Sequence, residues 1–163
     1  NVAIASASRK VDRALRAGAM AVGGSVTITT LPGYLPIQTS PALTDLYVDN
    51  ARMLVGEDGV TQMPHRSGST DMGDLSQIMP VIHPYVGAAT GNAHGADYVV
   101  QDYEMGVLTG AKAMAMTVID LLSERAAKAK EVKERDHAPM NKEQYLKFQR
   151  ARMEVVEFDG ATA

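Results

Sequence analysis

The segment from residue 67 to residue 94 most constrains how this chain can fold. A polar loop with a glycine at 67–71 is followed by a short apolar run at 78–82, and a second loop of small residues then leads to His94. The apolar run is typical of a buried strand, and Pro80 favours a sheet edge or a bulge. Small residues beside a strand let a ligand approach the backbone. The segment therefore predicts a site at the rim of a sheet.

Composition excludes several classes of protein. The 163 residues are enough for one domain with a core, and 16 basic against 19 acidic residues give a net charge of −3. No cluster of Lys and Arg is interleaved with aromatic residues, so nucleic acid is not an expected partner. The chain has no cysteine, so a metal would have to be held by histidines and carboxylates.

The most apolar stretch, 105–122, is predicted to be a buried amphipathic helix. It contains Lys112 and Asp120 and has helical spacing, so we do not expect it to cross a membrane. The N-terminal residues lack the basic region of a secretory signal. We therefore expect a cytoplasmic protein, and the absence of an initial Met suggests a fragment.

Capping residues and apolar spacing predict the other elements. Ser40 followed by Pro41 is typical of a helix start, and Gly56 of its end. The pattern at 141–144 resembles a capping box, and the charged run 124–136 is typical of a solvated helix extension or a linker. The predicted elements are a helix that begins after Ser6 or Ser8 and ends at Gly23–Gly24, a strand at 26–31, helices at 41–54 and 104–122, and a short last helix after Asn141.

Several polar side chains are candidates for a site, each with a plainer alternative. His94 is either a metal ligand whose tautomer Asp97 or a backbone carbonyl could fix, or a loop histidine bonded to the backbone. Asp71 either contacts substrate or closes an Asx-type turn, and Thr70 and Ser69 follow it with weaker signals. His83, at the end of the apolar run, is most simply a half-buried structural histidine.

Together these motifs resemble the C-terminal part of a known enzyme family. Residues 68–76, then 80–84, a glycine-rich loop, His94 and a helix ending at Leu122 follow one another as in the zinc-dependent amidohydrolases and exopeptidases of the peptidase M20 family. The nearest resemblance is to the aminobenzoyl-glutamate hydrolase-like branch. Residues 11–35 resemble the end of the smaller lid domain of that branch, so the resemblance spans about residues 9–122.

The resemblance implies an α/β fold. It combines part of a phosphorylase/hydrolase-like catalytic domain, a sheet with flanking helices, with a fragment of a ferredoxin-like lid domain. The implied division is the end of the lid or dimerisation domain at 1–36, the C-terminal part of the metal-dependent catalytic domain at 37–124, and a charged helical C-terminal extension at 125–163.

The resemblance also assigns roles to residues. His94 takes the place of the last metal ligand, and Asp71 lines the same cleft, with Thr70, Ser69 and His83 expected to contact substrate or support the ligand. Relatives usually have a hydroxyl and an acid after this histidine, whereas Gly95–Asp97 keeps only the acid. The family's other ligands and its general base precede the lid, so no catalytic residue is expected within this chain.

The implied function is hydrolysis of an amide bond to an amino acid by water activated on a divalent metal, zinc, with one or two ions. The substrate would be an N-acyl amino acid, an aminobenzoyl-glutamate-like conjugate or a dipeptide. The chain would act as a homo-oligomer or together with the missing N-terminal part, and would be inactive alone. Two alternatives remain open: a non-catalytic scaffold or dimerisation module, and a self-contained site built from Asp71, His83 and His94.

Overall fold

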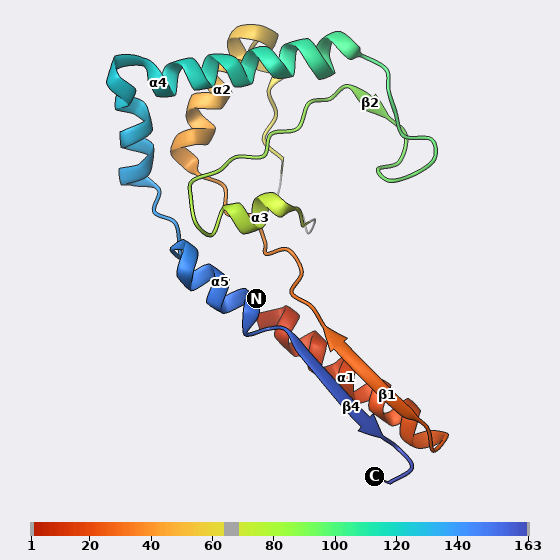
Figure 1. Cartoon of the computed structure of the whole chain (residues 1–163). Helices are drawn as coiled ribbons and strands as arrows, with labels where there is room; N and C mark the ends of the chain where they lie inside the picture. Colours follow the sequence, from red (N-terminus) through yellow and green to blue (C-terminus); the bar gives the residue numbers. More distant parts are fainter. Residues whose placement is uncertain (1, 64–68, 163) are drawn as a thin grey trace.

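A computed structural model describes residues 2–63 and 69–162 of the chain. One part of it, here called the strand unit, consists of helix α1 (Val2–Ala21) and the antiparallel strands β1 (Ser25–Thr30) and β4 (Glu154–Asp159). The strands pair from Ser25 opposite Asp159 to Thr30 opposite Glu154, and α1 packs along them (Figure 1). Ile28 in the middle of β1 is 8% exposed. The mixed α/β class is therefore confirmed.

The first helix ends where the sequence predicts but starts earlier. Ser6 and Ser8 lie inside α1, so the prediction that one of them caps the helix is wrong. At the other end, Gly23 has a φ of 61° and the Gly24 N–H donates to the carbonyl of Ala19 at 2.9 Å. Glycine adopts this left-handed conformation without strain, so the predicted stop is confirmed.

The second part, here called the helix unit, follows the connecting residues 31–39. It contains α2 (Pro41–Val55), the 3-10 turn η1 (Glu57–Gly59), α3 (Asp71–Leu75), the short strands β2 (Ala89–Thr90) and β3 (Val99–Val100), the π-helical segment η2 (Glu104–Thr109) and α4 (Gly110–Arg135). Ser40 caps α2 by accepting a hydrogen bond from the Leu43 N–H at 3.1 Å, as predicted.

A buried polar contact joins α2 to α4. Asn50 on α2 is 2% exposed, and its Nδ2 donates to the carbonyl of Leu46 at 3.1 Å and to the carboxylate of Asp120 at 2.8 Å. The same nitrogen lies 3.4 Å from the hydroxyl of Thr117. A buried amide must find such partners because an unsatisfied one is costly, so this cluster fixes how the two helices pack.

The prediction of a strand at 78–82 is wrong. Val81 is buried but makes only an isolated parallel bridge with Thr39, reinforced by a hydrogen bond from the Ser40 N–H to the Val81 carbonyl at 2.9 Å. The neighbouring chain turns into α2 at once, so the ladder cannot continue. The predicted sheet rim therefore does not form around this run within the described residues.

The helix predicted at 104–122 exists but is not buried all along. Asp102 caps it by accepting from the Met105 N–H at 2.8 Å, yet Val118, Ile119 and Leu122 are exposed because only one face meets α2. The helix from Glu104 to Arg135 has the length and apolar composition of a membrane span, a test that core helices of soluble proteins also pass. Backbone angles at 123–126 depart from the helix and turn its course (Figure 1).

The C-terminal residues return to the strand unit. Helix α5 (Lys142–Arg150) begins with the predicted capping box, in which Asn141 and Gln144 exchange hydrogen bonds of 2.9 Å each. Strand β4 then follows, where the sequence analysis expected only a helical extension. The domain limits at 36 and 124 stay predictions.

Candidate functional site

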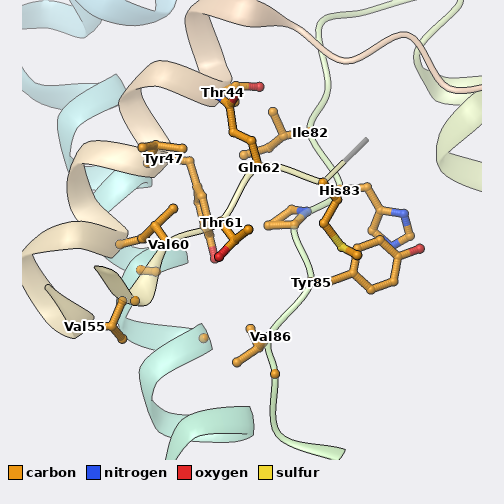
Figure 2. Close-up of a pocket in the computed structure, with 18 of the residues that line it drawn as sticks. Thr44, Tyr47, Val55, Val60, Thr61, Gln62, Ile82, His83, Tyr85 and Val86 are labelled. Atoms are coloured by element: carbon orange, nitrogen blue, oxygen red, sulfur yellow. The ribbon is translucent and has the colours of Figure 1, made fainter. Parts of the chain in front are cut away.

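The helix unit holds a cavity of about 410 Å³ between α2, the loop after η1, residues 82–87 and the start of α4. Figure 2 shows Tyr47 on α2 and the segment of His83 and Tyr85 on two sides of it. The His83 and Tyr85 rings lie 5.1 Å apart at 39°. Further lining comes from small apolar and hydroxyl side chains, namely Thr44, Val55, Val60, Thr61, Ile82 and Val86.

The environment changes the acidity of Tyr47, which lines the cavity. Burial raises the pKa of its phenol above the usual 10.0, because a phenolate is less well solvated there than in water. A phenol is protonated at neutral pH even without this shift, so Tyr47 offers a hydrogen-bond donor at the cavity wall. The sequence analysis predicted a helix at 41–54 but did not assign Tyr47 to a site, because the cavity also needs segments distant in the chain.

Of the predicted site residues, His83 is the one that lines this cavity, while His94, Asp71, Thr70 and Ser69 do not. His83 is exposed instead of half-buried. Its assignment to substrate contact stays a prediction.

His94 stands at the tip of a tight loop, residues 91–98. Its φ of 65° is left-handed, and the ring is exposed. The carboxylate of Asp97 accepts from both the N–H and the side-chain amide of Asn92, each at 3.2 Å, and the Gly95 N–H donates to the Asn92 carbonyl at 2.7 Å. Asp97 therefore closes the loop, and its role in orienting the imidazole stays a prediction. The loop presents His94 outward.

Thr70, Asp71 and Ser69 lie at the start of α3. The Thr70 hydroxyl accepts from the Met72 N–H at 3.1 Å, so Thr70 is the cap and Asp71, the first helical residue, is exposed. Ser69 is exposed as well. The sequence analysis considered Asp71 as the residue that closes this turn, and in the structure Thr70 closes it. The preceding residues 67 and 68 of the motif lie outside the described residues.

The second half of this motif has a structural role that the sequence analysis missed. Asp74 accepts from the backbone N–H of Leu35 at 3.2 Å, and the Ser76 hydroxyl accepts from the N–H of Gln38 at 3.0 Å. Ser76 and Gln77 are buried although polar. The sequence signal that could have indicated it is Gly73, because a glycine within a short helical segment permits a close approach of another part of the backbone.

The candidate ligands are not gathered into one site. Among residues 2–63 and 69–162, no group of three or more His, Asp and Glu side chains could hold a metal ion. The self-contained centre of Asp71, His83 and His94 is therefore not formed. A catalytic zinc normally needs three protein ligands, so the described residues alone do not fit one.

Comparison with known proteins gives two close matches. The chain is 33% identical to the Xaa-Arg dipeptidase of Mus musculus and to that of Homo sapiens, over 71% of this chain and 28% of each relative. It thus spans less than a third of the curated relatives it matches. No family model and no solved structure matches. Both of these relatives are named as dipeptidases.

Proposed function

We propose that this chain is part of a metal-dependent peptidase or amidohydrolase that cleaves an amide bond to an amino acid. The similarity to two dipeptidases carries the proposal and favours a dipeptide as substrate. An N-acyl amino acid or an aminobenzoyl-glutamate-like conjugate is the corresponding substrate if the chain belongs to the aminobenzoyl-glutamate hydrolase-like branch. Zinc is the proposed metal.

His94 is the proposed metal ligand of this chain. An exposed imidazole on a loop closed by its own hydrogen bonds is accessible to a metal held mainly by other parts of the enzyme. A neutral imidazole nitrogen is a good zinc ligand. The remaining ligands and the base that takes a proton from water would come from residues outside this chain, so the chain alone is proposed to be inactive.

The test is substitution of His94 in the intact enzyme that contains this chain. His94→Asn removes the imidazole, and asparagine tolerates the left-handed φ of 65° better than alanine does. Zinc content by mass spectrometry and dipeptide hydrolysis should both fall. The loss of activity should exceed about 100-fold, because groups that merely support a ligand already cost about 10- to 100-fold.

His137→Asn is the matched control, because His137 is also exposed but lies in the C-terminal segment. It should keep both the zinc and the activity. An intact enzyme whose His94→Asn variant retained its full metal content and turnover would overturn the assignment of His94.

A non-catalytic scaffold is the second candidate. The separation of His94 from the other candidate ligands in the described residues favours it. In that case the intact protein should bind no stoichiometric zinc and should hydrolyse neither dipeptides nor N-acyl amino acids, with or without His94.

A further inference from the structure

The strand unit and the helix unit are joined by two crossings of the chain. The first crossing is residues 31–39, and the second runs from Asp136 through α5 to β4 (Figure 1). Among the described elements, no helix or strand of the strand unit packs extensively on one of α2, α3 or α4. How the two units are oriented therefore depends on how the crossings are held.

Helix α3 and the two residues after it hold the first crossing. Leu35 is 1% exposed, its N–H donates to Asp74, and the Gln38 N–H donates to Ser76. Gly73 lies against this segment so closely that a Cβ would overlap the Leu35 carbonyl oxygen. The crossing is thus fixed by backbone contact as well as by hydrogen bonds.

The same block holds the second crossing. The Met140 N–H donates to the carbonyl of Gln77 at 2.9 Å, and the Gln149 side chain donates to Oδ1 of Asp74 at 3.2 Å. That oxygen also accepts from Leu35. One carboxylate oxygen therefore binds both crossings.

The second crossing is attached to the helix unit at one end and to the strand unit at the other. Asp136 accepts from the Ser40 hydroxyl and from the Ala42 N–H, the latter at 3.0 Å, at the start of α2. At the far end β4 pairs along all of β1, and the Gly160 N–H donates to the Gly24 carbonyl at 2.8 Å. The segment from 136 to 160 is therefore attached to both units.

We propose that residues 136–160 form a strap that locks the orientation of the strand unit relative to the helix unit, with residues 73–77 as the shared latch. The strap is a conformational device and does not depend on the proposed peptidase activity. Its release leaves the strand unit attached through residues 31–34, which precede the part of the first crossing that α3 holds, so the strand unit can pivot there.

Hydrogen exchange of the full chain tests whether the strap is one cooperative unit. Asp136→Ala should speed exchange at the Met140 and Gly160 amides together, by about 30-fold, because it removes two hydrogen bonds worth about 1 kcal/mol each from the equilibrium for opening. Asp136→Asn keeps an acceptor oxygen and should restore most of the protection. The control Asp97→Ala should act only on its own loop. Faster exchange confined to the start of α2 would overturn the proposal.

A distance measurement tests the lock itself. Because the chain has no cysteine, one pair of spin labels can be attached to a double variant, Arg13→Cys on α1 and Lys112→Cys on α4. Both positions are exposed. The distance distribution should broaden in the Gln149→Ala variant, which leaves the α2 cap intact, and more when Val156→Pro also detaches β4. A distribution as narrow as that of the parent in both variants would overturn the proposal.

Discussion

Replacing Gly73 by alanine tests the contact on which the junction of the two units depends. A Cβ at this position would overlap the Leu35 carbonyl oxygen and lie 3.3 Å from the Ile37 nitrogen. These are backbone atoms, so no side-chain rotation relieves the overlap, and the whole segment has to move away from α3.

The cost follows from what that movement breaks. The hydrogen bonds of Leu35 to Asp74 and of Gln38 to Ser76 are worth about 1 kcal/mol each. Partial exposure of the Leu35 side chain adds about 1–1.5 kcal/mol, half of its full burial. Alanine is favoured over glycine in a helix by about 1 kcal/mol, which offsets part of the loss. The free energy of unfolding should therefore fall by about 2–2.5 kcal/mol net.

Urea denaturation followed by circular dichroism measures this difference. The matched control is Gly18→Ala in α1, where no atom lies within 4 Å of the new Cβ and stability should rise by about 0.5–1 kcal/mol. The two glycines should thus respond with opposite signs. Equal stabilisation by both substitutions would refute the close packing of α3 on the first crossing.

Two further predictions concern α2. Asn50→Ala removes the hydrogen bonds to Thr117 and Asp120 from a buried position and should lower the free energy of unfolding by about 1–3 kcal/mol in the urea assay. Asp49→Ala, whose side chain is 73% exposed, should change it by less than about 0.5 kcal/mol. Because burial raises the pKa of Tyr47, the unfolded chain loses this proton first as the pH rises past 10.0, so stability should fall there until the folded phenol ionises. Tyr47→Phe should make that fall shallower in thermal melts between pH 9 and pH 11, and an unchanged slope would contradict the burial.

Among the residues predicted for a site, only His83 lines the cavity, so the sequence did not locate the candidate site as a whole. The motif around Asp71 was recognised from the sequence. In the structure, however, Thr70 caps the helix, and Asp74 and Ser76 bind backbone N–H groups of the connecting residues. Local pattern cannot distinguish a carboxylate that meets a ligand from one that meets a distant backbone N–H. The roles of His94, Asp71, Thr70, Ser69 and His83 in binding stay predictions.

The sequence by itself determined the features that a few neighbouring residues can satisfy. The Ser40 cap, the Asn141–Gln144 capping box and the stop at Gly23 each pair donors and acceptors within about four positions, so composition and spacing are enough. The tertiary structure decided the rest. Strand β4 exists because β1 lies beside it, and the run at 78–82 is not a strand because only Thr39 pairs with it. A strand needs a partner for its backbone hydrogen bonds, and that partner comes from a distant part of the chain.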